Sequence, residues 1–331
     1  MVRMTASTTF SGCVELIASG AKGAAKRLLL GLIALACLIF SHIPAQADTI
    51  YVSNQRDYTI VKFNSSGNGS VFANAGSGIY WPEGLACDTS GNLFVANLSD
   101  TILKFDSTGH GAVFATAGLN LPIGLALDQS GNLYAANLDS DTIVKFDSNG
   151  NGTVFANSNL AGPAGLAFDN RGNLYAANQH DNTVTKFDSS GHGSVFANAA
   201  SGIDWPTGLA FDSSGNLYVA NLMGNSVMKF DSNGNGSVFA TTGVNGPRGL
   251  AFDSSGSLFV VNQGSSSIVK FDSSGNGTLF ASGLANPLYI AIQVPEPATW
   301  SLLVLGAVVL FGTRRWRRRS SYCAANEEKS A

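Results

Sequence analysis

The sequence predicts an all-β fold, a six-bladed β-propeller with four strands in each blade. Three observations lead to this prediction. A Lys-Phe pair recurs with a period in the low forties, each period contains short apolar runs separated by Gly, Asn, Ser and Asp, and one strand of the set is displaced to the far end of the repeats. Such a period is typical of propeller blades. The short, interrupted runs exclude helical solenoids, which share similar periods.

Residues 1–47 are expected to form a signal peptide. Positive residues precede an apolar run over 28–40, and Ala45 and Ala47 place small side chains at the −3 and −1 positions of a cleavage site. The apolar run is short for a membrane span. Removal after Ala47 is therefore the prediction, and an uncleaved anchor remains the alternative.

From Asp48 to Gln293 the chain consists of one repeated unit. Its clearest copy reads GLAFDSSGNLYVAN over 208–221, followed by VMKFDSNGNGSVFA over 227–240. We expect four strands per unit, GLAFD, NLYVAN, TIVKFD and GSVFA, because glycine-containing turns suited to hairpins separate them. The lysine of the third strand marks the six copies at Lys62, Lys104, Lys145, Lys186, Lys229 and Lys270.

The first strand of the unit is clear in only five copies. Its sixth copy is the degenerate stretch PLYIAIQ over 287–293, at the end of the repeats. We therefore expect this C-terminal strand to complete the blade begun by the three N-terminal strands. That arrangement closes the ring and removes its open edges.

The pattern P-x-G-L-A-x-D-x-x-G-N-L-Y-V-A-N resembles that of the NHL-repeat propellers over residues 48–293. The resemblance implies the propeller fold. It does not imply one activity, because members of that family include scaffolds, ligand-binding modules and a few lyases or lactonases. The second strand commonly ends in Asp in that family, whereas here it ends in Asn, at Asn54, Asn97, Asn137, Asn178, Asn221 and Asn262.

The segment 294–319 resembles a PEP-CTERM sorting tail of Gram-negative bacteria. A Pro-Glu-Pro stem is followed by an apolar run over 300–312 and by an arginine cluster, and the residues concerned are Pro295, Glu296, Pro297, Arg314 and Arg315. The resemblance implies an exosortase-type membrane protease as partner, a transient C-terminal membrane anchor, and delivery to the cell surface or outside. A permanent single-span anchor is the alternative, and 320–331 is expected to be a disordered tail.

The net charge and the cysteine content of the repeat region limit what it is expected to bind and how it is cross-linked. Residues 48–293 contain 18 Asp and Glu against 9 Lys and Arg, a difference of −9. An acidic body repels phosphate backbones, so nucleic-acid binding is not expected. Cys87 is the single cysteine of this region, which allows no disulfide within it.

No residue pattern predicts a metal, a cofactor or a catalytic residue. The DSNGNG stretches over 147–152 and 231–236 begin like calcium loops but lack the glutamate at the twelfth position. The histidines are few and fall in separate blades, so a zinc site of several histidines is not expected. Residues that are identical in every blade are better explained by turn formation than by catalysis.

We therefore expect ligand-binding residues at positions where the copies of the repeated unit differ. Glu83 and Arg248 are the charged residues between the proline and the glycine of the first strand, and Tyr289 replaces that glycine. The long loops between blades carry aromatic residues at Tyr80, Trp81 and Trp205. Exposed aromatic rings suit stacking on sugars or peptides, and the alternative is that each indole folds over its own blade.

These observations predict an exported cell-surface or extracellular-matrix protein that acts as a non-enzymatic binding module or scaffold. The ligand would be an exopolysaccharide or another surface protein. The alternative is a metal-dependent enzyme, similar to a lactonase or a lyase, with its site in the central channel.

Overall fold

A computed structural model describes residues 47–294. The expected signal peptide up to Gln46, the sorting segment from Pro295 and the C-terminal tail lie outside the described residues. So do most of the residues assigned to processing, namely Ala45, Pro295, Glu296, Pro297, Arg314 and Arg315.

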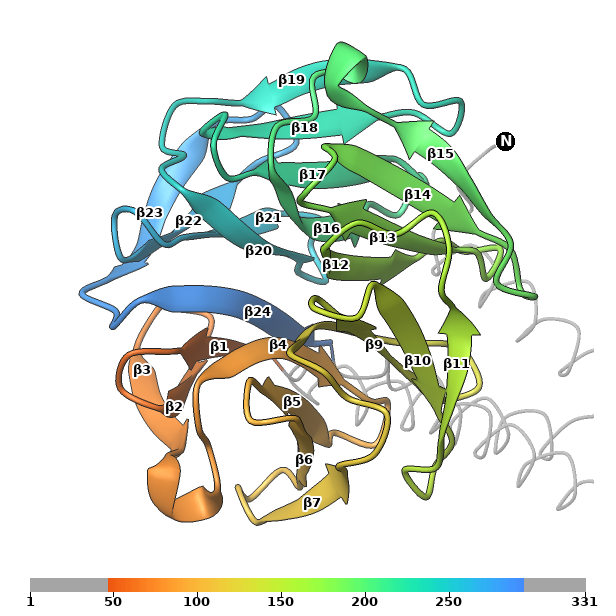
Figure 1. The fold of residues 1–331 in the computed structure, drawn as a ribbon. Coiled ribbons are helices and arrows are strands. Elements are labelled where there is room, and N and C mark those ends of the chain that lie inside the picture. The colour runs from red at the N-terminus through yellow and green to blue at the C-terminus, as the bar shows by residue number, and fades with distance from the viewer. Residues whose placement is uncertain (1–46, 295–331) are drawn as a thin grey trace, which may run out of the picture. The chain divides into compact units, whose positions relative to one another are not determined.

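The described residues form six four-stranded antiparallel sheets (Figure 1), which confirms the predicted propeller. Blade 1 contains β1 (Thr49–Asn54), β2 (Thr59–Phe63), β3 (Gly69–Ala73) and β24 (Pro287–Gln293). Blade 2 contains β4 (Pro82–Cys87), β5 (Leu93–Asn97), β6 (Thr101–Phe105) and β7 (Gly111–Ala115); blade 3 contains β8 (Pro122–Leu127), β9 (Leu133–Asn137), β10 (Thr142–Phe146) and β11 (Gly152–Ala156). Blade 4 contains β12 (Pro163–Phe168), β13 (Leu174–Asn178), β14 (Thr183–Phe187) and β15 (Gly193–Ala197); blade 5 contains β16 (Pro206–Phe211), β17 (Leu217–Asn221), β18 (Ser226–Phe230) and β19 (Gly236–Ala240). Blade 6 contains β20 (Pro247–Phe252), β21 (Leu258–Asn262), β22 (Ser267–Phe271) and β23 (Gly277–Ser282), and two 3₁₀ turns, η1 (Ala75–Ser77) and η2 (Ala199–Ser201), precede β4 and β16.

Asp-x-x-Gly-Asn turns, or close variants of them, form the hairpins at the end of the blades where β1 begins. Between β16 and β17, the Asp212 carboxylate accepts hydrogen bonds from the backbone N–H groups of Ser214 and Asn216, both at 2.9 Å. Gly215 adopts a φ of 83°, which an L side chain rarely tolerates. The calcium-like stretch from Asp231 makes the same bonds, so it is a hairpin turn as expected.

Aromatic side chains join neighbouring blades. The phenylalanine that ends the third strand is fully buried in blades 2 to 6, for example Phe146 and Phe187. The outer strand of the preceding blade supplies the ring that packs edge-on against it, such as Phe114 on Phe146 at 6.3 Å between centroids. Burial of each such side chain stabilises the fold by about 1.5–3 kcal/mol, and the repeated contact sets the blade spacing.

Glycines let the innermost strands approach one another at the axis. A Cβ on Gly124 would overlap the carbonyl oxygen of Ala164 in the next blade, and one on Gly165 would overlap that of Thr207. A cavity of about 110 Å³ lies in the channel, and Tyr289 lines it in the place of the sixth glycine. The other lining residues are Leu85, Gly124, Leu125, Gly165, Leu166, Gly208, Leu209, Leu250 and Ile290.

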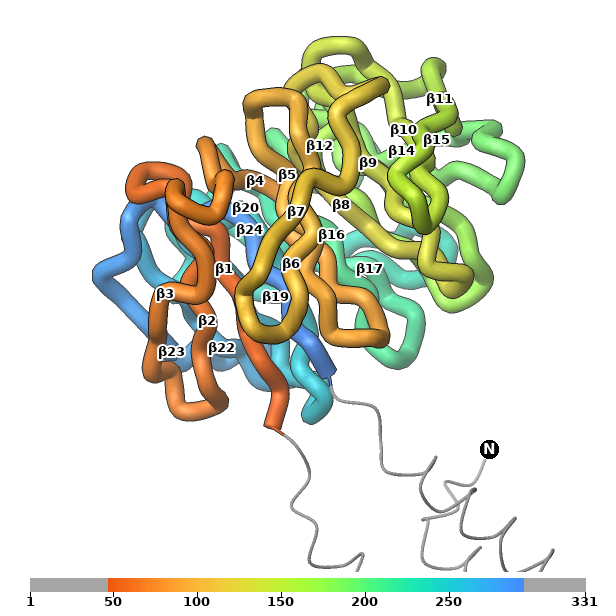
Figure 2. The backbone as a smooth tube through the Cα atoms, turned by 90° about the horizontal axis from the view of Figure 1, so that it is seen from below, coloured from red at the N-terminus to blue at the C-terminus, as the bar shows by residue number. Residues whose placement is uncertain are grey.

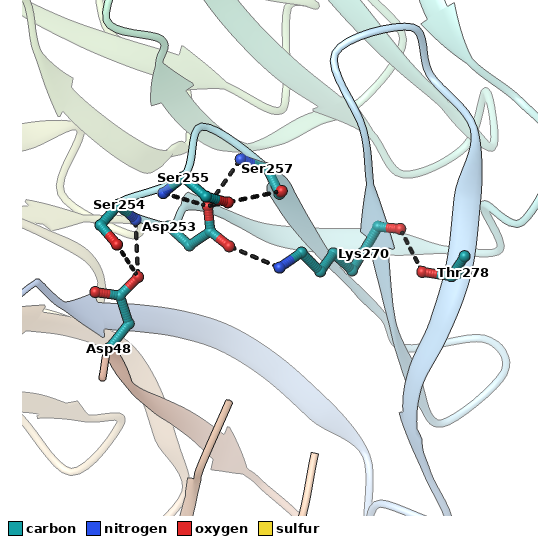
Figure 3. A network of polar contacts seen from close by, with 7 residues as sticks. All are labelled: Asp48, Asp253, Ser254, Ser255, Ser257, Lys270 and Thr278. Atoms are coloured by element: carbon teal, nitrogen blue, oxygen red, sulfur yellow. Dashed lines mark hydrogen bonds and ion pairs between the residues drawn. The ribbon is translucent and has the colours of Figure 1, made fainter. Parts of the chain in front are cut away.

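The C-terminal strand closes the ring, as the sequence predicts. β24 pairs antiparallel with β1, with Tyr51 opposite Ala291 and Thr49 opposite Gln293 (Figure 1). Asp48 extends this closure to blade 6, because one of its carboxylate oxygens accepts hydrogen bonds from the N–H and the hydroxyl of Ser254, both at 2.8 Å (Figure 3). The junction of blades 6 and 1 is thus held at both its inner strands and its edge.

The propeller has two distinct ends. We call the mouth face the end at which β4, β8, β12, β16, β20 and β24 begin; it is formed by the loops between blades and by the loops between the second and third strands. The opposite end is the terminal face, where β1 begins and β24 ends side by side (Figure 2). Within residues 47–294, no helix has the length and apolar character needed to cross a membrane.

Candidate ligand-binding site

A side-chain latch connects adjacent blades on the mouth face. A residue with positive φ in the loop before the third strand accepts a hydrogen bond from the backbone N–H of the residue that precedes the next blade's proline. In blade 4, Asn182 Oδ1 accepts from Trp205 N at 2.6 Å. The same latch occurs at Asp100, Asp141 and Asn225, with distances of 2.8, 2.6 and 2.7 Å.

Tyr58 replaces the latch residue in blade 1. Its φ is 52°, in the left-handed region that Asn and Asp tolerate and that is unfavourable for a bulky aromatic residue. A tyrosine ring has no oxygen that can reach back to form the short latch bond. Positive φ recurs at this position in every blade, and blade 6, with Ser266 at a φ of 50°, also lacks the latch bond among residues 47–294. Tyr58 differs from the other five residues in placing a bulky aromatic ring at a position where the left-handed conformation disfavours one, and such strain is concentrated at functional sites.

The ring of Tyr58 organises an aromatic patch with two residues of the next blade's entry loop. It stacks on Tyr80 with 5.2 Å between centroids and an interplanar angle of 24°, and it contacts Trp81 at 5.7 Å. Tyr80 is 52% exposed and Trp81 is 39% exposed, so the patch faces solvent. We refer to Tyr58, Tyr80 and Trp81 as the aromatic patch.

Trp205 occupies the equivalent position to Trp81 but has different surroundings. The two indoles lie three blades apart, and both have positive φ, 46° for Trp81 and 51° for Trp205. Trp205 packs edge-on against His180 at 6.2 Å, and the Asn182 latch holds its N–H. Each indole thus contacts a loop of the preceding blade, and the sequence similarity of the two loops does not extend to their partners.

A directed chain of hydrogen bonds crosses the junction of blades 6, 1 and 2 beside this patch. Arg248 Nε donates to Gln263 Oε1 at 2.8 Å, and Gln263 Nε2 donates to Asn286 Oδ1 at 2.9 Å. Asn286 Nδ2 donates to Gln55 Oε1 at 2.9 Å, and Gln55 Nε2 donates to Glu83 Oε1 at 2.6 Å. We call these five residues the amide chain.

Glu83 and Arg248 lie at the two ends of the amide chain. In the part of the chain described here they form no ion pair with each other, and three amides connect them instead. Tyr289 belongs to the same region: its backbone N–H donates to Ser53 Oγ at 3.0 Å, and its hydroxyl is buried without a hydrogen-bond partner among residues 47–294. The three repeat-breaking residues of the first strands are therefore gathered at one junction.

Burial governs the electrostatics of this junction. Glu83 is only 5% exposed, and burial raises its pKa to about 7, although the Arg248 charge and the hydrogen bond from Gln55 act in the opposite direction. The pKa of Tyr289 is also raised, first by burial and then by the nearby Glu83 carboxylate. Glu83 therefore changes its protonation near neutral pH, far above the ordinary value of 4.5.

This shift predicts a pH-dependent stability. Between about pH 4.5 and pH 7 the unfolded chain releases a proton that folded Glu83 retains, so the free energy of unfolding should fall as the pH rises through this window, by roughly 3 kcal/mol at most. Replacing Glu83 by glutamine should remove that component. Denaturant unfolding of both proteins at pH 5 and pH 8 measures it, and equal differences between the two pH values in both proteins would contradict the assignment.

Some members of this site were not predicted from the sequence. Tyr58, Gln55, Gln263 and Asn286 lie in loops, and only an alignment of the equivalent loop positions would have shown that Tyr58 stands where four blades carry Asp or Asn. Residues 47–294 contain no group of three or more His, Cys, Asp or Glu side chains placed to hold a metal ion. His110 and His192 lie in equivalent outer turns, each beside its own Asp106 or Asp188.

Comparison with known proteins identifies two regions. The family described as "Lactonase, 7-bladed beta-propeller" matches residues 126–298, and the "PEP-CTERM protein-sorting motif" matches residues 293–319. The second match confirms the sorting motif predicted from the sequence, which indicates export and processing by an exosortase. No curated protein matches the chain.

Solved structures share the propeller fold at low sequence identity. The chain is similar to a structure titled "Crystal structure of Nidogen/Laminin Complex", with a TM-score of 0.66 and 18% identity over 74% of this chain and 98% of that one. A streptogramin B lyase gives a TM-score of 0.60 and 15% identity over 75% of this chain and 88% of that one. A gluconolactonase from Xanthomonas campestris gives 0.53 and 20% identity over 60% and 75%.

The fold and the family match agree on a propeller but differ in the number of blades. The resemblance to NHL-repeat propellers holds for the six-bladed fold, and the structure closes with six blades where the family description has seven. Because the match over 126–298 covers more than half of the 331 residues, the chain belongs to the family described as "Lactonase, 7-bladed beta-propeller".

Proposed function

We propose that the protein is an exported binding module of the cell surface or extracellular matrix, and that its ligand binds to the aromatic patch on the mouth face. The sorting motif supports the location. The observation that carries the binding role is Tyr58, which takes a strained backbone conformation and loses a latch in order to place an aromatic ring beside Tyr80 and Trp81.

The physical chemistry of the patch suits a flat apolar ligand face. Three aromatic rings in contact lose little conformational entropy on binding, and two of them are substantially exposed. Aromatic rings contribute about 0.5–1.5 kcal/mol for each stacked contact beyond the area they bury. A sugar ring of an exopolysaccharide or an aromatic side chain of a surface protein would present such a face.

Replacing Trp81 and Trp205 together by alanine is expected to weaken retention of the protein on extracellular material from the producing cells by about tenfold or more, the loss of roughly 1.4 kcal/mol. Retention is measured by co-sedimentation, with circular dichroism as the test of folding. Met223→Ala is the matched control, because Met223 is 61% exposed in a loop of blade 5 on the same face and its removal should change nothing.

Two outcomes decide the role of the indoles. Retention that persists unchanged in the folded double variant would contradict the aromatic-platform function. Each single variant then separates the two positions: because Trp81 belongs to the patch and Trp205 packs on His180, the effect should come from Trp81→Ala.

The family match favours a second candidate, a metal-dependent enzyme similar to a lactonase or lyase, with its site in the channel. The buried Glu83, whose pKa is raised to about 7, has the protonation behaviour of a general acid or base. Metal in the purified protein that chelators remove together with activity would establish this candidate, and a metal-free preparation without lactonase or lyase activity would exclude it.

A further inference from the structure

We infer that the ligand of the mouth face is a neutral saccharide, whose ring stacks on the aromatic patch and whose hydroxyl groups bond to the adjacent amide chain. This inference rests on the proposed function and specifies its ligand. The carrying observation is a juxtaposition: Gln55 and Tyr58 share one short loop, and Trp81 and Glu83 flank a single proline. The aromatic and polar groups are therefore parts of one surface.

Charge balance at this surface favours a neutral ligand. The charged residues of the loops that form it are Arg56 and Asp57, which are exposed, together with Arg248 and buried Glu83. Their formal charges cancel above about pH 7, where Glu83 is ionised. An anionic sugar would meet exposed Asp57 and a repeat region with an excess of nine acidic residues, whereas a cationic ligand would meet Arg248 and Arg56. For a charged ligand of either sign, the attraction to this surface would not offset the hydration free energy that the charge loses on binding.

The unused hydrogen-bonding capacity matches hydroxyl groups. Within residues 47–294 the Arg248 side chain makes one hydrogen bond, through Nε, so its two Nη groups retain their donors. The amides of Gln55, Gln263 and Asn286 each keep an N–H donor and an acceptor lone pair, and all three residues are only partly buried. A hydroxyl group both donates and accepts, so vicinal hydroxyls can bond to a row of amides that offers both.

The direction of the hydrogen bonds fixes the orientation of each side-chain amide in the amide chain. Every amide donates toward Glu83 and accepts from the side of Arg248, so no member can rotate by 180° without breaking two bonds. Rotamer entropy is therefore already lost before a ligand arrives, which lowers the entropic cost of binding.

Binding of the full-length protein to three matched pairs of immobilised polymers tests the inference. The pairs are glucan and glucuronan, galactan and polygalacturonate, and mannan and polymannuronate, in which each pair differs by a carboxylate on the same sugar. We expect at least one neutral polymer to bind with a Kd about tenfold or more below that of its uronate partner, by biolayer interferometry. A preference for a uronate, or no binding to any neutral polymer, would overturn the inference.

Variants connect the preference to the named residues. Tyr58→Asn introduces the latch residue found in other blades, so the protein should fold at least as stably while its affinity for the neutral polymer falls about tenfold. At pH 8, where Glu83 is ionised, Glu83→Gln keeps the acceptor for Gln55 but leaves Arg248 uncompensated. The preference for the neutral polymer should then shrink about tenfold at low salt and recover at high salt. An unchanged preference in Glu83→Gln would contradict the charge-balance argument.

The two proposals fail in distinguishable ways. Suppose that retention on extracellular material depends on the aromatic patch and disappears when that material is treated with protease. The ligand would then be a protein, so the binding function would stand and the saccharide inference would fail. Absence of both retention and polymer binding would remove both.

Discussion

A chain that ends at Asn286 is expected to lose the closed ring and to unfold or aggregate. The missing strand β24 pairs along β1 and buries Leu288, Tyr289 and Ile290. Burial of three such side chains contributes about 4.5–9 kcal/mol, which is comparable with the whole net stability of a typical domain, about 5–15 kcal/mol. Without β24, two inner strands and the edge of β1 would also be exposed.

Limited proteolysis and thermal unfolding measure this effect. A chain that ends at Val294 is the matched control, because it lacks residues 295–319 of the sorting motif and keeps β24 complete. We expect the control to resist protease as the full chain does and the shorter chain to be digested at least tenfold faster. Equal resistance of the two truncated chains would show that ring closure by β24 is dispensable.

Replacing Gly124 by alanine is expected to destabilise the propeller by about 3 kcal/mol or more. The added Cβ would overlap the carbonyl oxygen of Ala164, which belongs to the backbone of the next blade and cannot rotate away. Overpacked cores typically lose 1–3 kcal/mol, and contact with rigid backbone places this site at or above the upper end. Denaturant unfolding of both proteins measures the change.

Gly76→Ala is the matched control for this substitution. Gly76 lies in the exposed turn η1, and the equivalent turn η2 carries Ala200 at that position without a change in its capping bonds. Its stability should change by less than about 0.5 kcal/mol. If Gly124→Ala were as mild as the control, the inner strands would have to separate more easily than their close packing implies.

The fold could be predicted almost completely from the sequence, because each blade repeats the same local signals. The lysine period, the Asp-x-x-Gly-Asn turns and the displaced strand over 287–293 each depend on residues that are close in the sequence or recur at a fixed spacing. These signals specify the strands, their order and the closure. No long-range contact had to be known to obtain them.

The candidate site could be predicted only in part. Glu83, Arg248, Tyr289, Tyr80 and Trp81 stand out because they break the repeat, and the structure brings them to one junction. The chain of amides between them could not be foreseen, since its central bond joins Asn286 to Gln55 across 231 positions of sequence. Nor does the sequence show that Trp205 packs on His180, since its loop nearly copies the one that carries Trp81.

The side-by-side ends of β1 and β24 also place the start of the sorting motif on one face of the propeller. The sorting motif begins at Gln293, on the terminal face, so any attachment through the motif holds the propeller by that end. The seven residues of β24 separate this point from the mouth face by about 23 Å at 3.3 Å per residue. The start of the motif and the aromatic patch therefore lie on opposite faces of the propeller, so a tether at Gln293 leaves the surface that carries the patch free for a ligand.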